Sequence, residues 1–337
     1  QLNLHPDMMG GNYWTTKATG GTPRSGLTGF ALNGLGYICN GSTGTDTNEV
    51  NQYNDTINAW VTKATGGTAR NSLASFSLGN FGYICNGRAG SLRNEVNQYN
   101  DKIDTWATVA NGGTVRSNLA GFTLNGFGYI CNGWDAVGGS TYYNEVNQYN
   151  DVINTWITRA NGGTSRAWLA GFALNGFGYI CDGGNPTNLN EVNQYNDTLN
   201  AWTTKATGGT ARSYLTGFSL NRLGYICNGN TSTQVNEVNE YNDVANTWIT
   251  KAPGGTARAN LAGLSLNGFG YICDGYTGSM SNEVNQYRNH NLYELTKSFR
   301  KSTKLPISIA IDTECTLLKD SKVALPVQLS TDGGTTW

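Results

Sequence analysis

Residues 27–63 have the sequence LTGFALNGLGYICNGSTGTDTNEVNQYNDTINAWVTK, and this stretch decides the fold. Asn33-Gly34 is the two-residue turn that β-hairpins favour, and it follows a run of alternating small and large residues. The aromatic and β-branched run after that turn suits a buried strand. No part of the stretch has helical periodicity with caps. It therefore predicts four short strands, at residues 27–32, 36–40, 49–53 and 58–63.

The stretch recurs as six copies of one unit, and four markers keep the same spacing in every copy. The Trp marker recurs at intervals of 46, 46, 50, 46 and 46 residues, at Trp14, Trp60, Trp106, Trp156, Trp202 and Trp248. An Arg follows each Trp by ten residues, at Arg24, Arg70, Arg116, Arg166, Arg212 and Arg258. A Tyr-Ile-Cys triplet ends at Cys39, Cys85, Cys131, Cys181, Cys227 and Cys273. An Asn-Glu-Val-Asn motif contributes Glu49, Glu95, Glu145, Glu191, Glu237 and Glu283. A four-stranded unit of this length, repeated, predicts the blades of a β-propeller.

The repeated unit resembles the kelch repeat. The resemblance rests on Pro23-Arg24, on Gly-Tyr-Ile-Cys-Asn-Gly at 36–41, and on Tyr53 and Trp60 seven residues apart. It covers about residues 11–287. Kelch repeats usually carry Gly-Gly where this chain has Asn-Gly or Asp-Gly, a mild departure because Asn and Asp also tolerate positive φ. The resemblance implies an all-β, six-bladed propeller of four-stranded blades.

The ends of the repeat region predict how the ring closes. The chain begins with an isolated fourth strand around Trp14, and the sixth unit ends at Tyr287, where Glu294 stands in place of the expected Trp. We expect the N-terminal strand to complete the last blade and cover its edge; a competing strand at 291–293 is the alternative. The predicted organisation is an N-terminal arm (1–10), a propeller (11–287) and a β-rich extension or start of a further module (288–337).

Composition excludes several functional classes. Charged residues make up 13% and the net charge is −1, so no basic surface for nucleic acid is present. No apolar run has the length of a membrane span. The two histidines, His5 and His290, lie outside the repeated strands, so we expect no metal or other cofactor. Copper chemistry of the galactose oxidase kind, known in some kelch-type enzymes, lacks its paired His ligands here.

The repeated polar residues are predicted to be structural. Six of the seven cysteines occupy equivalent positions, too far apart for disulfides, and should pack between blades as small hydrophobes. Cys315, the seventh cysteine, lies outside the repeated units. One Arg and one Glu per unit indicate a repeated ion pair, although a ring of Arg that attracts an anion is an alternative. A single reacting centre would need different residues in different blades.

The residues that differ between the copies are the candidate ligand site. They occupy the loops between the second and third strands and the position two residues after each repeated Arg, and both sets should emerge on one face of the ring. Exposed aromatic residues there suit sugar stacking or a protein hot spot. For Trp168 the alternative is a plug of the central channel, and Tyr142 and Tyr143 could simply begin a strand. The candidates are Trp134, Tyr142, Tyr143, Trp168, Tyr214, Asn118, Asn260, Arg88, Arg93 and Tyr276.

The sequence therefore predicts a non-catalytic module that binds a glycan or a protein through this face. Richness in Asn, Gly and Thr favours an extracellular, cell-surface or phage virion component. One alternative is a structural subunit that assembles through residues 288–337. Another is a sugar-processing enzyme on the same scaffold, for which Asp135, Arg88 and Arg93 are the available groups.

Overall fold

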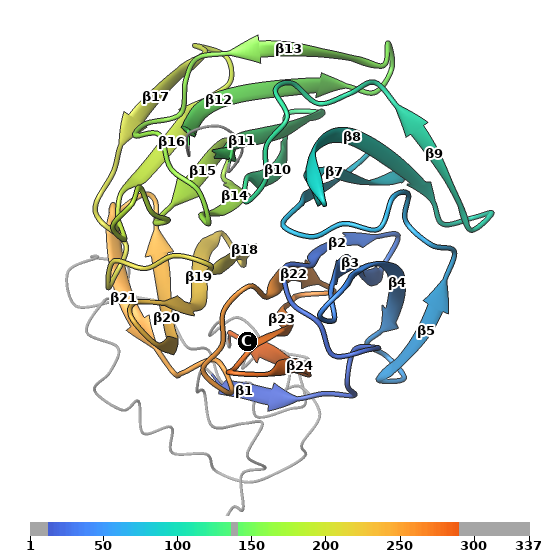
Figure 1. The fold of residues 1–337 in the computed structure, drawn as a ribbon. Coiled ribbons are helices and arrows are strands. Elements are labelled where there is room, and N and C mark those ends of the chain that lie inside the picture. Colours follow the sequence, from blue (N-terminus) through green and yellow to red (C-terminus); the bar gives the residue numbers. More distant parts are fainter. Residues whose placement is uncertain (1–12, 136–140, 290–337) are drawn as a thin grey trace, which may run out of the picture. The chain divides into compact units, whose positions relative to one another are not determined.

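The computed structural model describes residues 13–135 and 141–289, which form six four-stranded antiparallel sheets arranged as the blades of a ring (Figure 1). These two ranges contain strands and no helix. The predicted all-β, six-bladed propeller is confirmed. The predictions for the arm at 1–10 and for the extension from residue 290 onward lie outside the described residues.

Each blade contains four strands, in chain order in blades 1 to 5, whereas blade 6 takes its fourth strand from the N-terminal end of the described residues. Blades 1 to 3 consist of β2 (Thr28–Leu32), β3 (Leu35–Ser42), β4 (Asp46–Asn54) and β5 (Ala59–Lys63); β6 (Ala74–Leu78), β7 (Phe81–Ala89), β8 (Ser91–Asn100) and β9 (Thr105–Val109); β10 (Ala120–Leu124), β11 (Phe127–Asp135), β12 (Thr141–Asn150) and β13 (Thr155–Arg159). Blades 4 to 6 consist of β14 (Ala170–Leu174), β15 (Phe177–Cys181), β16 (Val192–Asn196) and β17 (Ala201–Thr204); β18 (Thr216–Leu220), β19 (Leu223–Asn230), β20 (Gln234–Asn242) and β21 (Thr247–Lys251); β22 (Ala262–Leu266), β23 (Phe269–Tyr276), β24 (Met280–Arg288) and β1 (Tyr13–Thr16).

The first strand of every blade lies innermost, and each contacts the first strand of the next blade. The second strand is buried on both faces, over 36–41 in β3, because a neighbouring blade packs on each side. This explains why its sequence is a nearly continuous apolar run rather than an alternating one. The fourth strand forms the exposed rim, as the half-buried and exposed residues of β5 show.

A β-bulge shifts the register between the second and third strands of most blades. In blade 1 the register shifts between Cys39 and Gly41, and Asn40 and Gly41 have φ values of 58° and 110°. A Cβ on Gly41 would lie 2.9 Å from the carbonyl oxygen of Ser25. The Asn-Gly pair that departs from the kelch pattern is therefore compatible with the backbone, since Asn tolerates the left-handed region and Gly avoids the clash.

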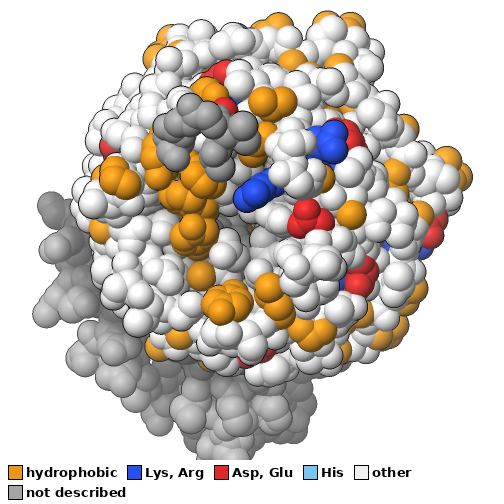
Figure 2. Space-filling view, in the orientation of Figure 1, with side chains coloured by type: hydrophobic (Ala, Val, Ile, Leu, Met, Phe, Trp, Pro, Cys, Tyr) orange, Lys and Arg blue, Asp and Glu red, His pale blue; other side chains and the backbone are white. Residues whose placement is uncertain are grey.

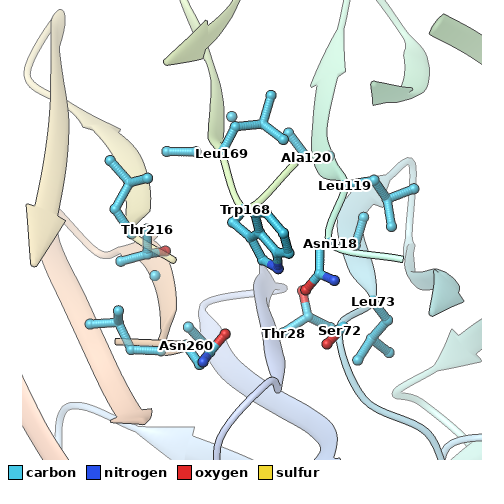
Figure 3. Close-up of a pocket in the computed structure, with 18 of the residues that line it drawn as sticks. Thr28, Ser72, Leu73, Asn118, Leu119, Ala120, Trp168, Leu169, Thr216 and Asn260 are labelled. Carbon is cyan, nitrogen blue, oxygen red and sulfur yellow. The ribbon is translucent and has the colours of Figure 1, made fainter. Parts of the chain in front are cut away.

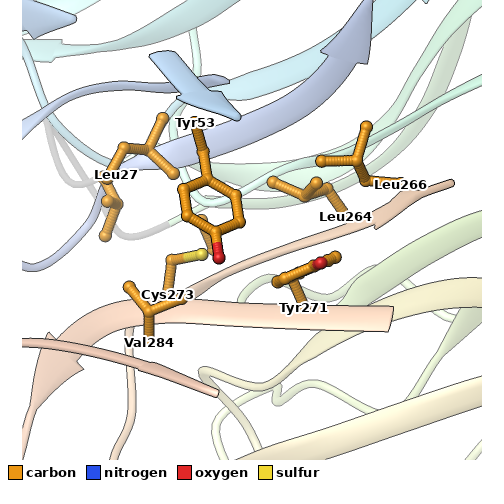
Figure 4. Packing of buried hydrophobic residues seen from close by; sticks show 9 residues of the cluster. Leu27, Tyr53, Leu264, Leu266, Tyr271, Cys273 and Val284 are labelled. Carbon is orange, nitrogen blue, oxygen red and sulfur yellow. The ribbon is translucent and has the colours of Figure 1, made fainter. Parts of the chain in front are cut away.

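The hydrophobic core lies between neighbouring blades (Figure 4). Tyr53 of β4 packs edge-on against Tyr271 of β23, with ring centroids 5.6 Å apart. Cys273 lies in the same cluster beside Leu27 and Val284. All six repeated cysteines are buried and unpaired, so they pack between blades as predicted.

The repeated Arg and Glu form one ion pair in each blade. The Arg24 guanidinium is fully buried and donates to Glu49 at 2.7 Å and to the Asn51 side chain at 2.7 Å. Glu49 also accepts the backbone N–H of Thr22 at 3.1 Å. The same arrangement recurs in the other five blades, with Arg–Glu distances of 2.7–2.9 Å. These contacts fix the loop between consecutive blades.

The ring closes through the N-terminal strand, as predicted. β1 pairs with β24, with Trp14 opposite Tyr287. The Trp14 indole N–H donates to the carbonyl of Ala252 at 3.0 Å, which completes a series in which each repeated Trp bonds to the linker of the preceding blade. Closure removes the free edge that β24 would otherwise expose.

Candidate functional site

An inner ring of six variable residues surrounds the mouth of the central channel. Each residue has a positive φ between 54° and 64°, and its backbone N–H donates to the carbonyl of the equivalent residue in the preceding blade at 2.7–2.9 Å. The sixth bond joins blade 1 to blade 6, so the hydrogen bonds close a circle. The members of this inner ring are Gly26, Ser72, Asn118, Trp168, Tyr214 and Asn260.

An outer ring lies beside the inner one. Its members follow the bulge glycine of each blade, and each forms a backbone β-bridge with the residue that precedes an inner-ring member. The two rings therefore place both variable positions of the sequence on one face. The outer ring consists of Ser42, Arg88, Trp134, Gly184, Asn230 and Tyr276.

Four aromatic side chains from three blades form a continuous group, which we call the aromatic shelf: Trp134, Tyr142, Trp168 and Tyr214. The Trp168 ring centroid lies 4.9 Å from that of Tyr214 and 5.4 Å from that of Trp134. Tyr142 lies edge-on to Trp168 at 5.9 Å. All four side chains are half-buried, so part of each ring faces solvent. Figure 2 shows hydrophobic side chains as a band beside the central hollow of this face.

Polar groups at the mouth accompany the shelf. Burial raises the pKa of Tyr214, with a further contribution from Tyr142, so its hydroxyl stays protonated at neutral pH and can donate. Among the described residues, the amide of Asn260 has no hydrogen-bond partner, and Asn118 uses its amide nitrogen on Ser117. The mouth thus offers free amide and hydroxyl groups beside aromatic faces.

The channel below the mouth is narrow and neutral. Its volume is about 130 Å³, and it is lined by the inner ring, by the Leu that follows each inner-ring residue and by small residues of the first strands (Figure 3). The hydroxyls of Thr28 and Ser75 lie 2.6 Å apart in this lining. None of the lining residues that the structure describes is charged.

The remaining candidates surround the shelf without joining it. Tyr143 lies opposite Gly133 in the strand pairing, and burial raises its pKa. Arg88 and Arg93 are exposed on the β7–β8 hairpin of blade 2. Tyr276, in blade 6, is 37% exposed. These four residues lie on the same face, but the ring contacts that define the shelf do not include them.

The sequence did not single out Gly26, Ser72 or the channel lining as parts of the site. Gly26 and Ser72 occupy the same variable position as Trp168, and this variability was the available signal. Their small side chains did not suggest a contact with a ligand. Within the described residues, no group of three or more His, Cys, Asp or Glu side chains is gathered as metal ligands would be. The described part of the chain also contains no helix long and apolar enough to cross a membrane.

No family model matches the chain, and no curated protein sequence matches it. The kelch resemblance therefore stays a prediction. Solved structures do match. One, titled "Structure of YjhT", has a TM-score of 0.67 and 14% sequence identity, over 80% of this chain and 96% of that chain. At this identity the likeness supports the propeller fold and nothing further.

Proposed function

We propose that this protein is a non-catalytic recognition module that binds carbohydrate through the aromatic shelf. The observation that carries the proposal is the contact of four half-buried rings from three blades. They lie at one channel mouth with the Asn260 amide, which has no partner among the described residues. The C–H faces of a sugar pack on aromatic faces, and its hydroxyls pair with amides. The shelf supplies the first kind of contact, and Asn118 and Asn260 supply the second.

The proposal contains no chemical step. The repeated Arg and Glu residues are engaged with each other in every blade, which is the expected state of groups that hold the loops in place. The exposed Arg88 and Arg93 would then contact the ligand periphery rather than reacting atoms. The composition, with only 13% charged residues, supports a surface, secreted or virion setting.

A protein ligand is the second candidate. Trp, Tyr and Arg dominate the binding energy of protein interfaces, and this face carries all three types around the mouth. Peptide binding would use the same shelf with Arg88 and Arg93 at its edge. Both candidate functions therefore predict that substitutions in the aromatic shelf weaken binding. They differ in whether a glycan or a peptide binds.

The test is binding of the purified chain to a printed glycan array. The variants Trp134→Ala and Trp168→Ala should each lose affinity by about tenfold or more, because each removes a face of the shelf. Ile153→Ala is the matched control, since Ile153 is 64% exposed in a turn between third and fourth strands, at the opposite edge of the blades. Unfolding temperatures close to wild type would show that the ring is intact.

A glycan signal that both Trp variants retain at full strength would overturn the proposal. A blank array would also overturn it and would favour the protein candidate. Turnover of a bound glycan by the wild-type chain would contradict the non-catalytic assignment.

A further inference from the structure

We propose that the open side of the channel mouth, at Gly26 and Ser72, is a subsite for the terminal residue of an uncharged glycan. This inference rests on the proposed carbohydrate binding and adds where the glycan ends and which chemical class it belongs to. It assigns a role in specificity to Gly26, a residue without a side chain.

The inner ring is asymmetric in size. Because the blades follow one another around the ring in chain order, blade 1 lies across from blade 4 and blade 2 across from blade 5. Trp168 therefore faces Gly26, and Tyr214 faces Ser72. The two largest inner-ring side chains lie opposite the two smallest, so the mouth has one aromatic side and one open side. Figure 3 shows the indole of Trp168 projecting into the space between the blades.

The backbone does not require glycine at residue 26. Its φ is 64°, and the equivalent residues of the other five blades are non-glycine residues with φ of 54–58°. A Cβ on Gly26 would come no closer than 3.4 Å to any neighbour, which is ordinary contact. The open side is therefore a consequence of which residue stands at this position and not of backbone strain.

The residues that line the open side are neutral. Two residues of opposite charge lie just outside the lining: Asp46 accepts the side-chain amide of Asn71, and Arg88 forms a backbone bridge with Asn71. The Ser72 hydroxyl donates to the side-chain oxygen of Asn71 at 2.7 Å and keeps its lone pairs for a ligand. Asn260 adds a side-chain amide beside Gly26. The backbone carbonyl of Asn260 accepts a hydrogen bond from the backbone N–H of Gly26. The lining itself offers no cation to a carboxylate or sulfate, whose burial there is costly, and the charges of Arg88 and Asp46 outside it oppose each other. A sugar hydroxyl can both donate and accept among the lining groups.

The channel is too small for a glycan chain to pass through it. A protein cavity of about 150 Å³ holds one benzene molecule, so the channel, with a volume of about 130 Å³, has room for one small ring at most. A sugar on the open side therefore has no continuation downward, and the rest of the glycan must extend outward over the aromatic shelf.

The test uses Gly26→Trp, which fills the open side with the residue that blade 4 already holds in the same backbone conformation. The probes are oligosaccharides that end in glucose, galactose, mannose or N-acetylglucosamine, and the same chains capped with sialic or glucuronic acid. Val244→Trp is the control, because Val244 is 90% exposed in the β20–β21 turn at the other edge of the blades. Gly26→Asn adds a smaller side chain at the same position.

We expect Gly26→Trp to lower affinity for the best neutral probe by at least about tenfold, Gly26→Asn to have an intermediate effect, and Val244→Trp to have none. Acid-capped probes should bind more weakly than their uncapped forms. If the shelf variants lose binding while Gly26→Trp keeps it, the subsite is wrong and carbohydrate binding stands. If the shelf variants keep binding, the proposed function itself fails. Tighter binding of the acid-capped probes would overturn the assignment to an uncharged ligand.

Discussion

The Asp274 carboxylate lies 3.8 Å from the Nε atom of Arg24 across the junction between blades 6 and 1, and both side chains are fully buried. Arg24 already forms its ion pair with Glu49. If Asp274 were ionised, the three side chains Arg24, Glu49 and Asp274 would together carry a net negative charge. Burial raises the pKa of Asp274 well above its usual range, although Arg24 and Arg258 oppose the shift.

The equivalent residue in four blades is Asn, and its amide donates to a carbonyl of the next linker, as Asn40 does to Thr68 at 3.1 Å. A protonated carboxyl can make the same donation and an ionised one cannot. Asp182 and Asp274 have no hydrogen-bond partner for either side-chain oxygen among the described residues. Asp182 lies 4.0 Å from Nε of Arg212, and burial likewise raises its pKa, opposed by Arg212 and Arg166.

The double variant Asp182→Asn, Asp274→Asn should be more stable than the wild type at pH 7. The unfolded carboxyls lose their protons near pH 3.9, while the folded ones keep them up to a higher pKa. Over that window wild-type stability falls as pH rises, by up to about 1.4 kcal/mol per pH unit for each carboxyl. Urea unfolding between pH 4 and pH 8 measures this difference, with Asp151→Asn in a turn as control. A pH-independent difference would contradict the assignment.

Removing one partner of a repeated ion pair should destabilise the ring. Glu95→Ala leaves the fully buried Arg70 guanidinium without its carboxylate, which lies 2.9 Å away. The expected loss is about 2 kcal/mol, below the range for fully buried pairs because Glu95 is partly exposed. Denaturant unfolding measures it. Glu95→Gln, which keeps the hydrogen-bonding oxygen but removes the charge, should cost less than Glu95→Ala. Equal losses would indicate that the charge accounts for the whole effect, and a Gln variant as stable as the wild type would indicate that charge plays no part.

The six repeated thiols should be unreactive in the folded protein. Burial raises the pKa of Cys39, Cys131 and Cys227 to about 12, so the reactive thiolate is scarce at neutral pH. Iodoacetamide labelling followed by peptide mass spectrometry should modify none of the six before unfolding and all of them after it. Labelling of any one under native conditions would show that its blade junction opens.

Deleting residues 1–17 should impair the ring. The deletion removes β1, its pairing with β24, and the Trp14 ring that lies 4.9 Å from Tyr287. β24 then becomes a free edge, and we expect lower stability and self-association. Unfolding curves and size-exclusion chromatography measure the two effects. Deleting residues 1–10 alone, which keeps β1, is the control, and identical behaviour of the two truncations would exclude the closure role.

Much of the fold was predictable because the sequence repeats. Where one copy alone leaves a strand uncertain, the other five copies support the same assignment. The isolated strand at Trp14 indicated how the ring closes. Strand bounds were predicted less well: the second strand of blade 1 runs over Leu35–Ser42, beyond the 36–40 that was expected. Leu35 is added at the hairpin turn, and Gly41 and Ser42 follow the bulge, where pairing continues in a shifted register that periodicity does not reveal.

The site was predicted only in part. The variable position after each Arg suggested Trp168 and Tyr214, because an exposed aromatic residue in a repeat is conspicuous. The structure brings their rings to 4.9 Å from each other, and their role in binding stays a prediction. The contact between Trp134 and Trp168 joins two blades, and its distance depends on how the blades pack. The same is true of the unpaired Asp182, since a single Asn-to-Asp difference has no visible consequence until its surroundings are known.

By itself, the sequence determined the number of blades, the order of their strands, the closure of the ring and the residues that vary, because these depend on local patterns and on their spacing. Only the tertiary structure decided that Trp168 faces Gly26 across the mouth and that the inner-ring backbone closes a circle of hydrogen bonds. It also decided that two buried carboxyls lack hydrogen-bond partners within the described ranges. These relations join residues far apart in the chain, and they exist only once the blades have packed around a common axis.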